Sequence, residues 1–466
     1  MTQQDATNLV NQIYDTIFNT ITKAEPGGKP LSPASTTVIS LMKPGMAINP
    51  NDFRNPWTPG NINGSKDAAV NTAHLADISP KMSALWQDSG NEVSKVYGDI
   101  MDNVQIPAQK PNPAIDKQLD DAHAYLYRTV QITDPDTGQL QSKEVESQIY
   151  RDYQDNAAAY QNARQAYLAA YLTANAPDNP NGKATWPLVA PTLQLPVKAA
   201  YDKWRAGFAD KVEQMLAIMN TSSQNALSKA FNKAKALYDG YGVVLEDTGT
   251  GQAPLVHRSS MLPSDWYSRD SASKWTAFSA RSGSFSSSSS SDFTSFGGSA
   301  GFSLGIFSIG GSAGHSKESR HASTETKNLQ VSFEYTLVSI RRPWGSFQLL
   351  NTSTWNLQNL YKKGKISNGT KNNQDGSVMP LLPTSFVVVR NVQIKADWAK
   401  SDFDFLKTTT NAGGSVGIGP FSIGGSYASS HSHQTFMSAF AGSSIIVPGV
   451  QIIGWISQIV PPCPPA

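Results

Sequence analysis

The chain has 466 residues, of which 39% are hydrophobic and 16% are charged, and its formal net charge is +2 at pH 7. A chain of this length and composition can bury a large core and is expected to hold two or more domains, which excludes a wholly disordered protein. The small net charge and the scattered lysines and arginines argue against a nucleic-acid-binding protein. One cysteine, Cys463, excludes an intramolecular disulfide framework and a multi-cysteine metal site, and we assign that residue no role.

The segment from Met1 to Ile21 has the pattern of an amphipathic helix, with Asp5 as a candidate cap. It lacks the charged and apolar regions of a secretory signal peptide. No later run approaches eighteen uninterrupted apolar residues, so a constitutive transmembrane helix is not expected. We therefore expect a protein that stays in the cytoplasm or leaves by a non-Sec route, and that acts at a target membrane.

Residues 1–242 are predicted to form a mainly helical domain. Proline, glycine and asparagine are dense over residues 27–66, which predicts an irregular region, and the same composition predicts a loop over 175–195. The sequence DPDTG predicts a tight turn at 134–138. Helices are expected from near Ser79 through Tyr97 and over residues 113–130, 142–174, 196–219 and 223–238.

From residue 243 the hydrophobic period changes to two, which predicts strands. The clearest candidates are residues 330–340, 386–396 and 444–459. The chain is therefore predicted to be an α+β protein, with an N-terminal helical bundle domain followed by an antiparallel β-domain over 243–466. Two long amphipathic hairpins are expected in that domain, near residues 280–328 and 400–440.

One glycine- and serine-rich motif occurs twice. The first copy, FGGSAGFSLGIFSIGGSAGH, spans residues 296–315, and the second, GGSVGIGPFSIGGSYASSH, spans 413–431. Each predicts a hairpin, with Gly305-Ile306 or Gly419-Pro420 as a two-residue turn, because glycine at the first turn position suits a type II′ turn. In the second copy, Ile418 would face Phe421 and Val416 would face Ile423.

Side-chain alternation gives each predicted hairpin one apolar face and one face of serine and glycine. Strands of about nine to eleven residues with this pattern are typical of membrane-spanning β-strands, but half-buried strands of a soluble sheet alternate in the same way. Charged residues are nearly absent from both copies, which favours the membrane interpretation. The candidate membrane-facing or interface residues at the tips are Phe302, Leu304, Phe307, Ile309, Val416, Ile418, Phe421 and Ile423.

The run SARSGSFSSSSSSDFTSF at 279–296 leads into the first copy and is expected to extend its first arm. Two Ser- and Thr-rich arms that flank a short amphipathic tip resemble the insertion region of aerolysin-type β-pore-forming toxins. Two such hairpins in one chain are similar, in number, to the perforin and cholesterol-dependent cytolysin superfamily. The resemblance implies a homo-oligomer that perforates a lipid bilayer when its hairpins join into a barrel.

The sequence predicts no catalytic site. The seven histidines show no metal-ligand spacing, and no nucleophile elbow or phosphate-binding loop is present, so we expect no enzyme, no metal, no cofactor and no small-molecule ligand. His315 and His431 occupy equivalent positions in the two motif copies and form a candidate pH switch, with surface histidines of no role as the alternative.

Two other functions fit the same patterns. Hairpins with exposed strand edges also suit a self-assembling structural protein that forms a tube, shell or lattice by β-hairpin addition. A carbohydrate- or protein-binding module that uses Trp344, Trp355 and Trp398 is a third interpretation.

Overall fold

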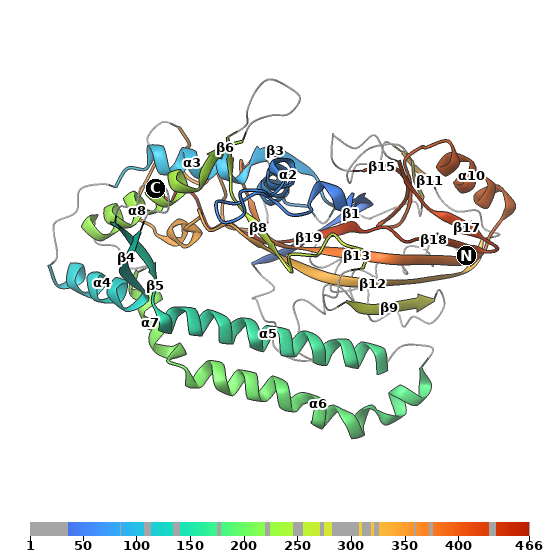
Figure 1. Ribbon diagram of the computed structural model, residues 1–466, viewed down its shortest axis with the longest axis horizontal. Coiled ribbons are helices and arrows are strands. Elements are labelled where there is room, and N and C mark those ends of the chain that lie inside the picture. The colour runs from blue at the N-terminus through green and yellow to red at the C-terminus, as the bar shows by residue number, and fades with distance from the viewer. Residues whose placement is uncertain are drawn as a thin grey trace.

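Figure 1 shows the computed structural model of the chain. The described residues are 36–83, 85–106, 113–133, 140–174, 179–219, 224–245, 255–270, 275–281, 307–309, 318–320, 326–357, 360–371, 376–427 and 435–465. The fold is α+β, as predicted, and every ladder between its described strands is antiparallel.

A long twisted sheet forms the centre of the molecule (Figure 1). Its two longest strands are β12 (Lys327–Arg341) and β13 (Leu381–Asp397), whose alternating sequences were predicted as strands. The predicted strand at 444–459 divides at Pro448-Gly449 into β18 (Ser444–Val447) and β19 (Gln451–Ile459). The other strands are β1 (Thr37–Ala47), β8 (Ser260–Leu262), β9 (Thr276–Arg281) and β17 (Ala439–Ala441), in the order β1-β19-β13-β12-β8, with β9 on β12, β18 on β13 and β17 on β18.

Strand β1 corrects the prediction of an irregular region over residues 27–66. All eleven of its residues are buried, and it pairs with β19 along most of its length. The Pro44-Gly45 pair suggested a loop, but the register shifts between Leu41 and Met46, so a bulge accommodates the proline and glycine within the strand. Phe53, just after the strand, is buried against Trp266.

The helices partly follow the prediction. The helix expected from near Ser79 through Tyr97 begins only at Val93, because residues 78–80 and 88–92 form β2 (Ile78–Pro80) and β3 (Asp88–Glu92) instead. Residues 127–133 and 140–146, which include the expected end of one helix and start of the next, form an antiparallel strand pair in which Thr133 lies opposite Leu140. Its TVQIT sequence contains β-branched residues that favour a strand, and the predicted DPDTG turn lies outside the described residues. The described helices are α2 (Lys66–Asp77), α3 (Val93–Asn103), α4 (Pro113–Leu126), α5 (Gln148–Ala174), α6 (Pro180–Ala206), α7 (Ala209–Met219), α8 (Gln224–Tyr241) and α10 (Lys400–Asn411). Further short strands are β4 (Tyr127–Thr133), β5 (Leu140–Glu146), β6 (Gly242–Val244) and β7 (Leu255–His257).

Helix α6 is the largest departure from the prediction, because it occupies most of the loop expected at 175–195. Its interior contains Pro187, Pro191 and Pro196, and prolines normally interrupt a helix. Aromatic packing against α5 compensates: Trp186 lies 5.5 Å from Tyr167 and Trp204 lies 5.6 Å from Tyr160, measured between ring centroids. The two helices therefore form a long antiparallel pair, which we call the helical arm (Figure 1).

The predicted boundary at residue 242 crosses shared cores. Strand β1 belongs to the central sheet, and α3 and α8 pack with Trp344 and Trp355 in one buried cluster. Cys463 is buried in the same cluster, where Ile366 and Ser367 donate backbone hydrogen bonds to its carbonyl oxygen. The C-terminal segment is thus part of the packed structure.

Candidate functional site

The second motif copy forms the hairpin that its sequence predicts, with one difference. Strands β14 (Val416–Ile418) and β15 (Phe421–Ser426) flank the Gly419-Pro420 turn, and Ile418 pairs with Phe421 as expected. Gly419 has φ 56°, which requires the freedom of a glycine. Val416 pairs with Gly424 instead of the predicted Ile423, because a bulge shifts the register.

The described residues of the two motif copies lie side by side. Strand β10 (Phe307–Ile309) of the first copy pairs antiparallel with β14 of the second, so that Phe307 faces Ile418 and Ser308 faces Gly417. With β11 (Glu318–Arg320) and β16 (Thr435–Met437), they make a five-stranded sheet in the order β11-β10-β14-β15-β16. We call this the repeat sheet.

The candidate tip residues face the core of the chain in this conformation. Phe307, Val416, Ile418, Phe421 and Ile423 are each at most 2% exposed, and Phe421 lies 5.2 Å from Phe333 of β12 between ring centroids. In this conformation these residues face neither lipid nor a neighbouring chain, because their apolar side chains pack on the chain's own central sheet. Ile309 is half-buried, and Phe302 and Leu304 lie outside the described residues.

The predicted polar face of the repeat sheet is buried only in part, because Ser415 is half-buried and Ser426 is exposed. Ser308 is fully buried, and Ser422 exchanges two hydrogen bonds with the buried side chain of Gln451 on β19. The Ser422 amide donates to Gln451 Oε1 (2.7 Å), and Gln451 Nε2 donates to the Ser422 carbonyl oxygen (3.3 Å). The side-chain amide of Gln451 takes the place of a neighbouring strand at Ser422. We call this pair of hydrogen bonds the Gln451 latch.

The latched hairpin also fits closely against β1. A Cβ at Gly45 would lie 2.7 Å from the Pro420 carbonyl oxygen, and a Cβ at Gly417 would lie 2.5 Å from Pro44 Cβ. Only glycine permits these approaches, so the bulge in β1 and the tight turn are shaped for each other. Lys43 in this bulge is 7% exposed, and burial lowers its pKa to about 8.

Both motif copies lie in segments that leave the central sheet at the same end. Residues 282–326, insert 1, connect β9 to β12, and residues 398–443, insert 2, connect β13 to β18. Arg281 pairs with Gln330, Gln330 with Lys395, and Lys395 with Ser444, which places residues near the ends of four neighbouring strands in one row. Figure 1 shows α10 and the repeat sheet gathered at this end.

The end of insert 1 and the start of insert 2 are tied together by buried hydrogen bonds. Thr326, at the end of insert 1, donates through Oγ1 to Asp402 Oδ2 (2.6 Å) and accepts from the Ala399 amide (3.0 Å). Asp402 and Ala399 belong to insert 2, and Asp402 is fully buried. Trp398 donates from Nε1 to the Ser443 carbonyl oxygen (2.8 Å), which joins the two ends of insert 2.

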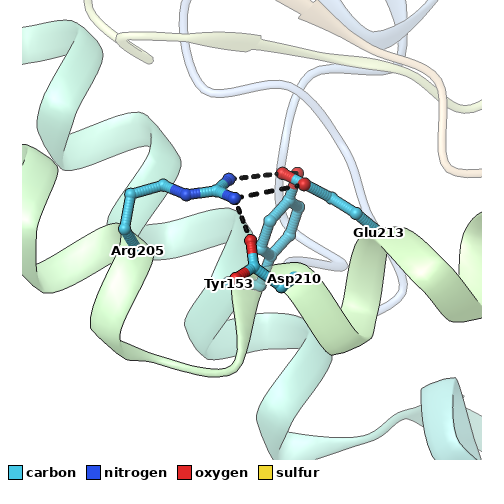
Figure 2. Close-up of polar contacts among 4 residues, drawn as sticks. All are labelled: Tyr153, Arg205, Asp210 and Glu213. Carbon is cyan, nitrogen blue, oxygen red and sulfur yellow. Dashed lines mark hydrogen bonds and ion pairs between the residues drawn. The ribbon is translucent and has the colours of Figure 1, made fainter.

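The base of the helical arm is held by a cluster of charges (Figure 2). Arg205, near the end of α6, donates to Glu213 Oε1 at 2.7 Å and also pairs with Asp210, and Tyr153 donates to Glu213 Oε1 at 3.3 Å. The hydrogen bond to Glu213 raises the pKa of Arg205. This cluster spans the break between α6 and α7, where Phe208 has φ 64°.

The remaining predicted sites are outside the described residues or buried. His315 and His431, the candidate pH switch, lie outside them. Trp344 and Trp355 are at most 1% exposed, so a binding groove that uses them is wrong. Within the described residues, no three His, Cys, Asp or Glu side chains gather in a way that could hold a metal ion. Among the described helices, none combines the length and apolar character needed to span a bilayer.

The residues that hold the inserts were missed by sequence reasoning. Gln451 is the one polar side chain in the run IIVPGVQIIGWI, and an isolated amide in such a run signals a buried hydrogen-bonding role. Thr326 and Asp402 are 76 positions apart and gave no such signal.

Comparison with known proteins found no matching family model, no matching curated protein and no matching solved structure.

Proposed function

We propose that the protein perforates membranes as a homo-oligomer, after inserts 1 and 2 leave the repeat sheet and refold as two hairpins that extend the central sheet. The observation that carries the proposal is the row Arg281–Gln330–Lys395–Ser444, from which both inserts depart. Insert 1 joins the neighbouring strands β9 and β12. Insert 2 joins the neighbouring strands β13 and β18, and its last part forms β17 on the other side of β18, so a hairpin can continue these ladders once β17 has left the central sheet.

The length and composition of the inserts suit this role. Each has about 45 residues, so each arm of a hairpin would have about twenty residues, where a spanning strand needs only nine to eleven. The motif residues alternate between apolar and hydroxyl side chains, so lipid would meet phenylalanine, leucine, isoleucine and valine while serine lines the lumen. Hairpins from several chains must close into a ring, because an open sheet edge in lipid leaves backbone groups unpaired.

The first experiment measures dye release from liposomes and examines the same samples by electron microscopy. We expect leakage together with ring-shaped particles on the vesicles. Ordered tubes, shells or lattices without leakage would support the self-assembling structural protein instead. Monomers without leakage over a range of lipid compositions and pH values would overturn both functions.

A second experiment asks whether insert 2 leaves the core. Native Cys463 is buried, so a thiol probe will report on introduced cysteines. Ser422→Cys replaces a buried serine of insert 2, and the control Ser457→Cys replaces a buried serine of central strand β19. We expect vesicles to make the thiol at position 422 reactive while the thiol at 457 stays protected. Equal protection of both thiols during leakage would contradict release of the insert.

A further inference from the structure

The outward face of α6 exposes large apolar side chains that no described element covers. Leu188 is 80% exposed, Leu195 62%, Val189 43% and Leu193 37%. We call these four residues the α6 patch. They lie within eight positions of one helix, whereas exposed apolar residues on most proteins are scattered singly.

The surroundings of the patch are uncharged. From Ala184 to Val197 the helix contains no Asp, Glu, Lys or Arg, and the three internal prolines lie in the same stretch. Trp186 packs on Tyr167 and Tyr171 of α5, and the helical repeat places Leu188 and Leu195 on the opposite side of α6 from Trp186. Leu188 and Leu195 therefore remain for an external contact.

The patch belongs to the outer helix of the arm. Helix α5 contacts β9, and α6 lies on the side of α5 away from the sheet (Figure 1). The end of the arm where α6 begins is directed toward the end of the molecule from which the inserts depart (Figure 1). The side of α6 that faces away from α5 is therefore also away from the central sheet.

The size of the patch favours lipid over a protein as its binding partner. Its four side chains expose on the order of 400 Å², about half of the ~800 Å² that each partner buries in a stable protein–protein interface. It also offers no charged group to orient a partner. A lipid interface needs neither a minimum matching area nor orientation, and helices with aliphatic side chains on one face insert into it.

We propose that the α6 patch docks on the interfacial region of a lipid bilayer and holds the protein there while the inserts are still folded. The inference rests on the proposed membrane function, since it names the contact that precedes perforation. It concerns residues outside both inserts, so the two can fail separately.

The test uses the full chain with an environment-sensitive fluorophore on Leu188→Cys, and phosphatidylcholine vesicles with and without phosphatidylserine. The matched control carries the label on Leu255→Cys, which replaces a leucine that is 63% exposed on β7. We expect a blue shift and vesicle co-flotation with the label at position 188 and no shift with the label at 255. No shift at either position, or equal shifts at both, would overturn the docking inference.

Leu188→Asp/Leu195→Asp provides the second arm of the test, with Leu255→Asp as its control. We expect the double variant to reduce vesicle co-flotation at least tenfold while the control binds as the parent chain does. Unchanged flotation and leakage in the double variant overturn the inference and leave the pore proposal standing. Vesicle flotation that depends on the patch, without leakage, would support the docking inference and contradict the pore proposal. If the parent chain forms dimers in solution but does not bind vesicles, and the double variant is monomeric, the patch contacts a second copy of the chain. That result would also overturn the docking inference.

Discussion

The repeat sheet and the helical arm both contain long uncharged stretches, yet the protein treats them in opposite ways. Residues 413–427 of insert 2 are packed between the central sheet and α10, with Ile418 2% exposed. Residues 184–197 of α6 lie on the outside, with Leu188 80% exposed. Absence of charge therefore identifies candidate membrane segments without telling which of them are on the surface before contact with a membrane.

The sharpest test of this contrast replaces one aliphatic residue in each region. Ile418→Ala removes fully packed methylene and methyl groups and should lower the free energy of unfolding by about 2–5 kcal/mol. Leu188→Ala should change it by less than about 0.5 kcal/mol, because its side chain is already in water. Urea denaturation followed by tryptophan fluorescence measures both. Similar values for the two variants would show that the contrast in packing is wrong.

The Gln451 latch should give the next largest effect. Gln451→Leu leaves the buried amide and carbonyl of Ser422 without their partner, which should cost about 1–3 kcal/mol and speed amide hydrogen exchange in β15. Gln458→Leu is the control, because Gln458 is exposed on the same strand. If exchange in β15 is no faster in Gln451→Leu than in Gln458→Leu, the amide does not hold insert 2.

Lys43, in the bulge of β1 that contacts the Gly419-Pro420 hairpin, predicts that folding stability depends on pH. Burial lowers its pKa from 10.5 to about 8, so between these values the unfolded chain binds a proton that the folded chain does not. Stability should therefore rise with pH from about 8 to 10.5, and the cost of the buried charge is fully present below pH 8.

Lys43→Met should remove that cost and exceed the parent chain in stability by about 1–3 kcal/mol at pH 7, with the difference shrinking toward pH 10.5. Denaturation of both proteins at four pH values measures the difference, which cancels the titration of the tyrosines. A difference that is constant with pH would contradict a buried ammonium at this position.

The smallest effect is expected at the exposed base of the arm. Glu213→Gln weakens the contact with Arg205, but the two side chains are 42% and 31% exposed, so the loss should stay below about 1 kcal/mol and fade in 1 M salt. A double-mutant cycle with Arg205→Met measures the coupling. A salt-independent coupling of several kcal/mol would mean that the arm is held as firmly as the inserts.

The sequence predicted those elements whose signal is local. Strands β12 and β13 alternate over many residues, and the turn at Gly419-Pro420 is encoded by adjacent residues. Strand β1 was missed because its bulge at Pro44-Gly45 is made possible by β19, some 400 positions away. Helix α6 was missed because its prolines suggest a loop, whereas its stability comes from tryptophans that pack on α5.

Within the candidate site, the hairpin and its two faces could be predicted but their surroundings could not. Alternation shows that Ile418 and Phe421 share a face, but it does not show whether that face meets lipid, a neighbouring chain or the chain's own sheet. That choice depends on contacts such as Phe421 with Phe333 and Ser422 with Gln451, which depend on the whole fold.

The ladder between β10 and β14 makes the two motif copies depend on each other. Phe307 and Ile418 are cross-strand neighbours, although they belong to different inserts. If one insert departs, the strand that remains becomes an unprotected edge with unpaired amides and carbonyls. Partial opening is thus disfavoured, and the transition should be all-or-none, so that a weak stimulus opens neither insert and a sufficient one opens both.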